Sequence, residues 1–430
     1  MLAGMNKYPL LIKLAILAAI TLLLCGVLGE IRGLAQERQA RQREAQKSVE
    51  ESLAGPQTLL GPILIRHCTE TWAPYKDGVQ TRTFEHRLAP SQLQASGSLT
   101  PEPRHRGLFK VNTYASALTL SARWNDTSGL TPKPENAGGR VECSDVAAML
   151  SVRDARGLRK VVLTRDGREL AVKPGTTDAA YTSGLHALLE AARPGEPLEL
   201  KLTLELTGTQ SLAIVPAASN TTVALNSSWP HPSFGGRFLP TKSDVNDSGF
   251  VANWQVTELA SGAVADVVAG KGNLDTLDVE LIDPVNPYVM SDRAIKYGLI
   301  FIALTFVTVG LTELLSDRRV HPVQYLLVGM ALSLFFLLLL SLSEHLPFLQ
   351  AYLIASVAAG AVLTQYAAAM LGGWLRGALF GGGIALLYGA LYVLLSREQT
   401  ALVIGAVLLF AVLAAVMTLT RKLDWYALKA

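Results

Sequence analysis

Residue types that can carry out catalysis occur along the chain, but not at the spacings that known catalytic and metal-binding motifs require. No HExxH, CxxC, GxSxG or GxxxxGK[ST] pattern is present, and no serine stands three residues before a lysine. The seven histidines are scattered without the spacing of metal ligands. The sequence therefore predicts no catalytic residue, metal or cofactor. A hydrolase has no nucleophile or metal motif to support it.

One short stretch, NSSWPHPSFGGRFLP at residues 226–240, holds three prolines, two adjacent glycines and several aromatic residues. Such a stretch cannot be a helix or an interior strand. One interpretation is structural: a kinked crossing between strands, pinned by its aromatic side chains to an apolar face. The other is functional, because loops often carry binding surfaces. The candidate residues of this corner are Trp229, Pro230, His231, Pro232, Phe234 and Phe238.

The composition predicts a membrane protein. Of the 430 residues, 50% are hydrophobic and 17% are charged, whereas a soluble protein has about a quarter charged residues. The net charge of +3 provides no basic face for nucleic acid. Membrane lipid is therefore an expected partner, and nucleic acid is not.

Six apolar segments are long enough to cross a bilayer. The first, 9–29, is followed directly by Glu30 and Arg32 instead of a small-residue cleavage site, which favours a retained anchor over a signal peptide. The other five are joined by short connections and predict an antiparallel bundle; they cover residues 294–315, 323–342, 347–370, 375–395 and 401–419.

Positive charge in short loops marks the cytoplasmic side of a membrane. The loops and the tail on one side of the bundle carry Arg318, Arg319, Arg376, Arg421, Lys422 and Lys429, whereas the alternate loops carry Arg397 alone. This count places both termini in the cytoplasm and residues 29–293 outside. The arginine-rich segment after the first span disagrees, but long domains translocate largely regardless of charge.

The polar region between the first two spans predicts a helical stalk followed by a β-rich domain. Residues 30–53 are rich in good helix formers. Farther on, leucines alternate with polar residues over 198–206, as in a strand with one buried face. Regular short strands with turn signals predict a sandwich-like, α+β fold, and 183–192 predicts a short helix. The expected divisions are 1–29, 30–56, 57–293, 294–420 and 421–430.

Two of the three cysteines, Cys68 and Cys143, lie in this outer domain, where disulfides persist. They form either a bridge or two separately buried thiols.

Small residues recur every four positions in the fifth span and predict a ridge for close helix packing, within the bundle or at a homo-oligomer seam; they are Gly377, Gly381, Ala385 and Gly389. Glu313 is expected near Arg318 or the interface. Glu344 and His345 either sense pH or simply end a helix. Four polar residues either join helices or line a transport cavity: Gln365, Tyr366, Tyr388 and Tyr392.

Several long, irregular motifs resemble the CreD inner-membrane proteins of bacteria, also called cell envelope integrity proteins. The resemblance covers nearly the whole chain and is carried by AGPQTLLGPIL (54–64), GTQSLAIVP (208–216), WPHPSFGGRFLP (229–240), GFVANWQV (249–256), HPVQYLLVGMALSLFFLLLLSLSEH (321–345) and LTRKLDWY (419–426). It implies one anchor, a large periplasmic domain and a C-terminal bundle. It also implies a role in envelope integrity and in tolerance of colicins and β-lactams, without known catalytic residues. Residues 126–140 depart from the family pattern, and no function is attached to them.

Two functions follow as hypotheses. The first is a non-catalytic periplasmic domain that binds or stabilises an envelope component, with an unidentified periplasmic or inner-membrane partner. The alternative is a transporter or flippase of a small or lipid-linked substrate through the five-helix bundle.

Overall fold

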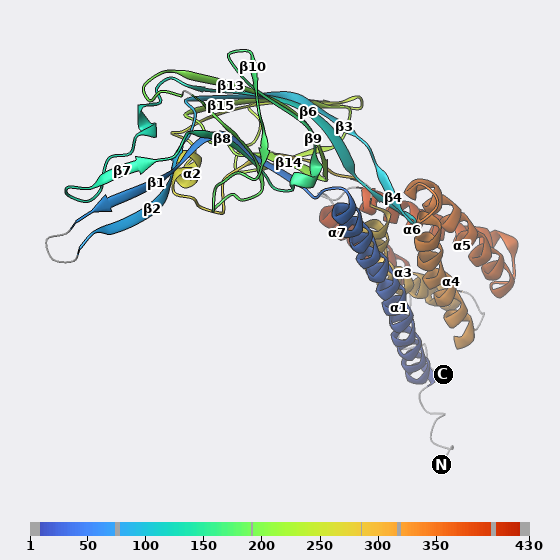
Figure 1. Cartoon of the computed structure of the whole chain (residues 1–430). Helices are drawn as coiled ribbons and strands as arrows, with labels where there is room; N and C mark the ends of the chain where they lie inside the picture. The colour runs from blue at the N-terminus through green and yellow to red at the C-terminus, as the bar shows by residue number, and fades with distance from the viewer. Residues whose placement is uncertain are drawn as a thin grey trace. The chain divides into compact units, whose positions relative to one another are not determined.

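The computed structural model describes residues 9–73, 78–190, 192–284, 286–315, 320–396 and 401–421. The chain divides into two compact units, one formed by Met1–Gln42 with Val285–Ala430 and the other by Arg43–Pro284. The first unit is helical and the second is built mainly of strands (Figure 1). Arg318, Arg319, Arg397 and the predicted tail beyond Arg421 lie outside the described residues.

The N-terminal segment is one unbroken helix, α1 (Pro9–Ser52), of 44 residues. Proline is tolerated at its first position because no helical hydrogen bond is lost there. The predicted membrane span and the predicted stalk are therefore two parts of the same helix. Its second part is polar and carries pairs one turn apart, such as the Arg41–Glu37 ion pair at 2.6 Å.

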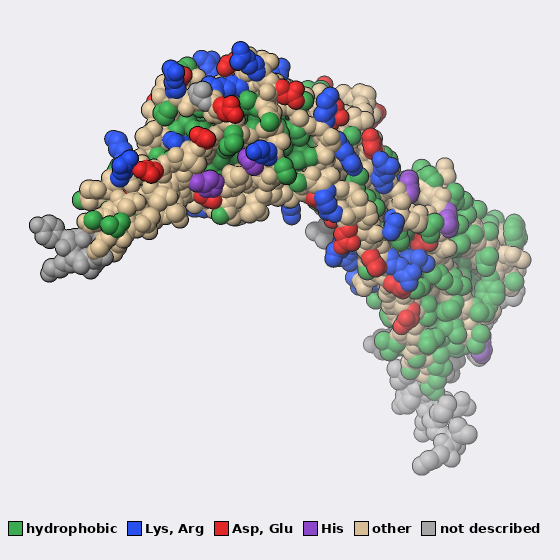
Figure 2. Space-filling view, viewed as in Figure 1, with side chains coloured by type: hydrophobic (Ala, Val, Ile, Leu, Met, Phe, Trp, Pro, Cys, Tyr) green, Lys and Arg blue, Asp and Glu red, His purple; other side chains and the backbone are tan. Residues whose placement is uncertain are grey.

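Five further helices follow the β-rich unit: α3 (Pro287–Leu315), α4 (Pro322–Ser343), α5 (Phe348–Met370), α6 (Trp374–Ser396) and α7 (Ala401–Thr420). Among the described residues, α1, α3, α4, α5 and α6 are long and apolar enough to cross a membrane, and α7 has a shorter apolar stretch, Val403–Thr418. Hydrophobic side chains cover the surface of these helices, while charged ones gather over the strands (Figure 2). The predicted membrane architecture is confirmed.

The helix α3 begins seven residues earlier than the predicted span. The side chain of Asn286 accepts a hydrogen bond of 3.0 Å from the backbone N–H of Tyr288, and this contact satisfies a donor of the first helical turn. The added turns are polar at Asp292, which forms an ion pair of 2.9 Å with Lys296 just inside the predicted span. Hydropathy alone could not include them in a membrane span.

The helix α1 is packed into the helical unit and is more than a tether. Leu24 and Leu28 are almost fully buried. Leu24 lies against Gly329 of α4, and Leu28 lies against Gly298 of α3. Because glycine has no side chain, the leucines can approach the backbones of both helices. The bundle therefore includes α1 in addition to the C-terminal helices.

The β-rich unit contains two large sheets. The nine-stranded sheet, here sheet A, has the order β11 (Lys173–Pro174), β12 (Gly184–Leu188), β8 (Ala147–Val152), β1 (Gln57–Trp72), β14 (Ser211–Ile214), β19 (Leu277–Leu281), β16 (Pro232–Gly236), with β2 (Gln80–Leu88) and β7 (Arg140–Cys143) also paired to β1. The eight-stranded sheet B has the order β10 (Arg168–Leu170), β9 (Leu158–Arg165), β13 (Leu198–Thr209), β6 (Thr113–Trp124), β3 (Gln92–Pro101), β15 (Asn220–Ser227), β18 (Gly249–Thr257), β17 (Lys242–Asn246).

The remaining elements of this unit are short. They are the ribbon of β4 (Arg104–Arg106) and β5 (Phe109–Val111), the 3₁₀ turns η2 (Ser128–Leu130) and η3 (Ala155–Gly157), and the helix α2 (Ala263–Val268).

The two sheets enclose one large apolar core, to which sheet A contributes Leu59 and Leu64, and sheet B contributes the leucines of β13. The predicted alternation of β13 is confirmed, since its leucines are buried while Glu199, Lys201 and Glu205 are exposed. Each fully buried leucine contributes about 1.5–3 kcal/mol relative to an exposed one. A sandwich is the arrangement that buries this face.

Sheet A is covered on its second face as well. Leu60, Ile63 and Ile65 of β1 pack with Ala263 and Val267 of α2 in a separate apolar cluster. Burial on both faces explains why β1 begins as a continuous apolar run instead of an alternating one.

The predicted helix at 183–192 is wrong, because residues Gly184–Leu188 form β12. The segment pairs with β8, with Leu185 opposite Leu150, and Leu185 and Ala187 enter the core. Its leucine and alanine content favours a helix, but tertiary pairing outweighs that preference. Gly184 has φ +143°, and a Cβ there would lie 2.1 Å from the carbonyl oxygen of Leu150.

Candidate functional site

The segment at 226–240 crosses between the two sheets. The chain leaves β15 in sheet B, forms β16 at the end of sheet A, and returns as β17 at the end of sheet B. Trp229 is buried, and its Nε1 donates to the carbonyl oxygens of His231 at 3.1 Å and Ile282 at 3.0 Å. The indole thus fixes the turn at the start of the crossing.

The two phenylalanines of this crossing segment are half-buried and pack against the main core. The ring of Phe234 meets Phe250 edge to face at 5.7 Å and Trp254 at 5.8 Å between centroids. The Nε1 of Trp254 donates to the carbonyl oxygen of Phe238 at 3.1 Å. These contacts agree with the structural interpretation, in which aromatic side chains hold the segment to an apolar face.

The proline and histidine side chains of the crossing segment point away from the deepest core. Pro230 and Pro232 are half-buried and His231 is exposed. Pro232 stands in β16, which is an edge strand, where the missing N–H costs no ladder bond. The described residues contain no group of three or more potential metal-ligating side chains.

The crossing segment ends beside a hollow of about 470 Å³ on the outer face of sheet B. The hollow is lined by Gln94 and Ser96 of β3, Thr222 and Ala224 of β15, Asn253 and Gln255 of β18, and by Thr241 and Lys242. Sequence reasoning missed this site, because its residues come from four strands and only the strand pairing brings them together.

The Cys68 and Cys143 side chains form a disulfide with an S–S distance of 2.02 Å. The two cysteines stand opposite each other on β1 and β7, and Cys25 is a free thiol. Glu70, two residues beyond Cys68, is buried and accepts a hydrogen bond of 2.7 Å from the backbone of Asn136. The bridge attaches a short strand, and the loop before it, to the longest strand of sheet A.

A buried charged cluster joins β2 to the loop before β12. Arg87 donates to the carboxylate of Asp178 at 2.6 and 2.9 Å, and it also pairs with Glu85. The hydrogen bond that Arg87 donates to Asp178 raises the pKa of Arg87, with burial acting in the opposite direction. Asp178 also accepts from the backbone of Ala180 at 2.8 Å. Because the guanidinium and both carboxylates have hydrogen-bond partners, this cluster is a structural connection.

An ion pair within the helical unit joins Lys13 of α1 to Glu313 of α3. The hydroxyl of Tyr325, on α4, donates to the same carboxylate at 3.1 Å. Arg318, the partner considered from sequence, lies outside the described residues. Sequence reasoning missed this pairing, although a lysine inside the first apolar run was a visible signal.

Glu344 and His345, at the end of α4, differ in their surroundings. Glu344 forms an ion pair of 3.1 Å with Arg38 of α1, and its side chain is 11% exposed. His345 is exposed. The pairing gives Glu344 a structural role in attaching α1 to the bundle.

The four small residues of the ridge on α6 are not equivalent. A Cβ on Gly377 would lie 2.5 Å from Ala368 Cβ, and one on Gly381 would lie 2.0 Å from Thr364 Oγ1, both on α5. Ala385 and Gly389 are exposed. The first half of the ridge therefore packs on α5, whereas the second half faces outward.

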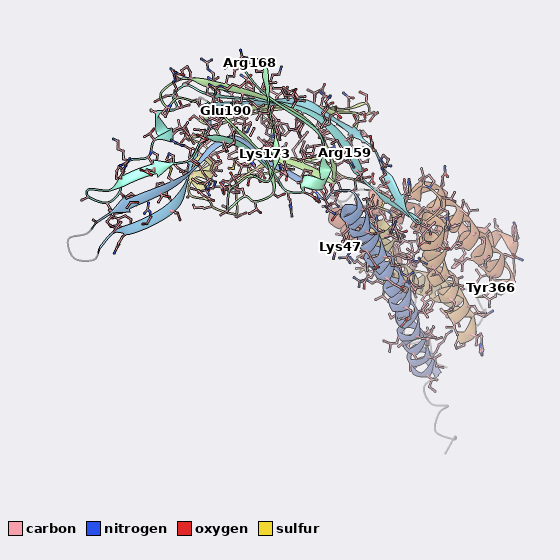
Figure 3. The ribbon with its side chains drawn as sticks, viewed as in Figure 1. Lys47, Arg159, Arg168, Lys173, Glu190 and Tyr366 are labelled. Carbon is pink, nitrogen blue, oxygen red and sulfur yellow. A yellow bond between two sulfur atoms is a disulfide. The ribbon has the colours of Figure 1, made fainter. Side chains whose placement is uncertain are left out.

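The four polar residues considered for transport do not converge. Tyr388 is buried, and its carbonyl accepts a hydrogen bond of 2.6 Å from Tyr352, which also contacts Tyr392. Gln365 is exposed, and Tyr366 lies at the periphery of the helices (Figure 3). The interior tyrosines form an aromatic cluster with Phe335.

Comparison with known proteins assigns the chain to a family. The model of the family described as Inner membrane protein CreD matches residues 9–426. The chain belongs to the CreD family. Inner membrane protein CreD of Escherichia coli (strain K12) is 35% identical over 432 residues, covering 98% of this chain and 95% of that protein. The CreD relationship and the membrane-spanning helices together establish a multi-pass inner-membrane protein of the bacterial envelope.

The likeness to two solved structures is remote. Two crystal structures of an M1 zinc metallopeptidase from Deinococcus radiodurans align with 45% of this chain and 42% of their own, at 12% identity and a TM-score of 0.23. No conclusion about fold or activity follows from that score.

Proposed function

We propose that this protein supports cell envelope integrity, and with it tolerance of colicins and β-lactams, through a non-catalytic binding or scaffold domain. In this proposal the β-rich unit lies in the periplasm and both termini lie in the cytoplasm. The sandwich presents a ligand- or partner-binding surface that the helices hold at the membrane.

The Cys68–Cys143 disulfide is the observation that carries this proposal. Disulfides persist in oxidising compartments such as the periplasm and are rare in the cytoplasm. The bridge lies in the same unit that the loop charges predict to be outside. Two independent features thus support the same side of the membrane for the sandwich.

Transport receives less support from the bundle. Tyr388 lies among packed aromatic rings, and Gln365 is exposed. A transport path needs polar groups that converge on one cavity. The binding or scaffold function is therefore preferred.

The first test is complementation in a strain that lacks the gene. The full chain is expressed at matched membrane abundance, and survival is measured after exposure to a pore-forming colicin and, separately, to a β-lactam. The proposal expects restored survival. Equal survival of the deleted and complemented strains would contradict it.

A second test concerns the side of the membrane. Single cysteines are introduced at the exposed positions His231 and Lys201 in a chain with Cys25→Ser. Intact cells are then treated with a membrane-impermeant maleimide. Labelling of both cysteines before lysis supports a periplasmic sandwich; labelling only after lysis would place the sandwich in the cytoplasm.

A further inference from the structure

The outer face of sheet B has a consistent chemical character around the hollow. The strand registers place Gln94, Thr222 and Gln255 side by side in one row. They place Ser96, Ala224 and Asn253 in the next. Both rows carry a short side chain at the centre; the first has an amide on each flank, and the second has the hydroxyl of Ser96 on one flank and the amide of Asn253 on the other.

One positive charge completes the second row. Lys242 on β17 is paired with Asn253 on β18, and the backbone of Thr241 donates to the carbonyl of Asn253 at 2.8 Å. Thr241 and Lys242 form one wall of the hollow. The crossing segment sets the position of this wall, because the Phe238 carbonyl accepts a hydrogen bond from Trp254. The segment at 226–240 therefore contributes to the hollow indirectly, by fixing the residues that follow it.

The polar ends of the hollow remain available to a ligand. In the described part of the chain, no other residue hydrogen-bonds to or forms an ion pair with the side chains of Gln94, Lys242, Asn253 or Gln255. A side-chain amide offers a donor and an acceptor, and an ammonium offers donors only. The side-chain amides of the hollow can thus bind the hydroxyl and amide groups of a ligand, and the ammonium of Lys242 can bind one anionic group.

We propose that this hollow binds a sugar residue that carries hydroxyl and acetamido groups and one carboxylate. The amides of Gln94, Asn253 and Gln255 match the hydroxyl and acetamido groups. Lys242 matches the carboxylate, and the floor at Ala224 leaves room for the ring. The volume of about 470 Å³ falls in the range of about 300–1,000 Å³ for small-molecule sites.

Other ligand classes fit less well. A protein interface is usually centred on large aromatic or aliphatic anchors, but among the lining residues Val223 and Trp254 are about 2% exposed. Nucleic acid needs many basic contacts, and Lys242 is the single basic lining residue. This inference deepens the proposed function and rests on it, because it names the class of envelope ligand.

The test uses the full chain in lipid nanodiscs and saturation-transfer NMR with two probes, N-acetylmuramic acid and N-acetylglucosamine. The probes share the acetamido sugar ring, and the first alone carries a lactyl carboxylate. Ala224→Trp fills the floor, Lys242→Ala removes the charge, and Lys201→Ala is the matched control. Lys201 is exposed on the same sheet face and does not line the hollow.

We expect the native chain to bind both sugars and to prefer the acidic one. Ala224→Trp should weaken both by about tenfold, which corresponds to about 1.4 kcal/mol. Lys242→Ala should reduce the preference by about threefold, as for a partly exposed ion pair, and Lys201→Ala should change neither. Equal unfolding midpoints of all four proteins ensure that the sandwich is intact.

The inference is overturned if neither sugar receives saturation transfer from the native chain, or if Ala224→Trp binds both sugars as the native chain does. It is also overturned if Lys242→Ala keeps the full preference for the acidic sugar. Complementation separates it from the proposed function. Sugar binding by a chain that fails to restore survival supports the site and contradicts the function. Restored survival without sugar binding supports the function and contradicts the site.

Discussion

Leu24 of α1 and Gly329 of α4 are in such close contact that a Cβ on the glycine would lie 2.2 Å from Leu24 Cδ1 and 3.2 Å from Phe306 Cζ. We expect Gly329→Val to force α1 away from α4 and to destabilise the helical unit by about 1–3 kcal/mol, as overpacking of a well-filled core does. Unfolding of the full chain in mixed detergent micelles measures the loss.

The matched control for this change is Gly360→Val on α5. A Cβ at Gly360 has no neighbouring atom within 4 Å, so the same substitution should leave the unfolding midpoint nearly unchanged. Equal effects at Gly329 and Gly360 would mean that α1 does not pack on α4.

The ion pair between Lys13 and Glu313 should be needed for stable insertion of the chain. Glu313→Gln leaves the ammonium of Lys13 without its partner, and a lone charge costs about 2.5–3.5 kcal/mol at the centre of a membrane helix and less near its end. We expect reduced membrane abundance for this variant, measured by quantitative immunoblotting. The exchanged pair, Lys13→Glu with Glu313→Lys, should recover much of the loss.

Glu37→Gln is the control for the membrane pair. Its partner Arg41 is 56% exposed, and such exposed pairs contribute about 0.3–0.5 kcal/mol on a helix. If the exchanged pair is no more abundant than Glu313→Gln alone, the two side chains do not interact in the membrane.

The indole of Trp229 should stabilise the crossing segment through both its ring and its N–H. Trp229→Ala should cost about 3–5 kcal/mol, as for other buried aromatic residues. Trp229→Phe keeps most of the ring but leaves two carbonyl oxygens without their donor, and should cost about 1–3 kcal/mol. Denaturant unfolding of the full chain ranks the two variants.

His231→Ala serves as the neighbouring control, because substitution of an exposed side chain usually changes the free energy of unfolding by no more than about 0.5 kcal/mol. The structural interpretation of the corner fails if Trp229→Ala is as stable as His231→Ala.

The buried pair of Arg87 and Asp178 should behave differently from a surface pair. Asp178→Ala leaves a buried guanidinium with less compensation, and breaking such a pair costs about 3–5 kcal/mol. We expect faster hydrogen exchange of β2 and of residues 176–181. For comparison, Glu102 is 44% exposed and pairs with Arg104, so Glu102→Ala should cost about 0–1 kcal/mol. Similar exchange in both variants would argue against a buried pair.

Asp154 should make the sandwich sensitive to acid. Its hydrogen bond from Arg156, together with one from the backbone of Gly55, lowers the pKa of the carboxyl below its usual value of 3.8. Because the folded pKa is the lower one, the stabilisation is present above about pH 3.8 and is lost as the pH falls through the folded value.

Asp154→Asn tests this direction of the pH dependence, because a neutral amide gains no proton as the pH falls below 3.8. The variant should be less stable than the native chain at neutral pH, and the difference should shrink below pH 3.8. Unfolding midpoints measured from pH 2 to pH 7 give the comparison. A constant difference across this range would exclude the carboxylate as its source.

The sequence predicted the features that depend on local pattern. Apolar length identified the membrane helices, and the period of two in β13 identified a buried strand face. The aromatic residues at 229–238 indicated a fixed corner, because such side chains must be buried somewhere. Each of these signals depends on neighbouring residues, which the sequence supplies directly.

Features that depend on tertiary pairing could not be predicted from local sequence pattern. Residues 184–188 have helical propensity, but β8 holds them as a strand. The partner of Glu313 comes from a helix 300 positions earlier, and the hollow combines β3 with three strands that lie far later in the sequence. The outward position of Gly389 depends on how far α5 follows α6, which the four-residue repeat does not specify.

The crossing segment also connects the edge strands of the two sheets. Its β16 ends sheet A and the β17 that follows ends sheet B, so one edge strand of each sheet comes from one short part of the chain. Edges of this kind invite strand addition and aggregation, and proline or charge discourages both. Pro232 stands in the first edge, and Lys242 and Asp244 stand in the second. Proline in one edge strand and charge in the other therefore disfavour pairing of the domain with other chains.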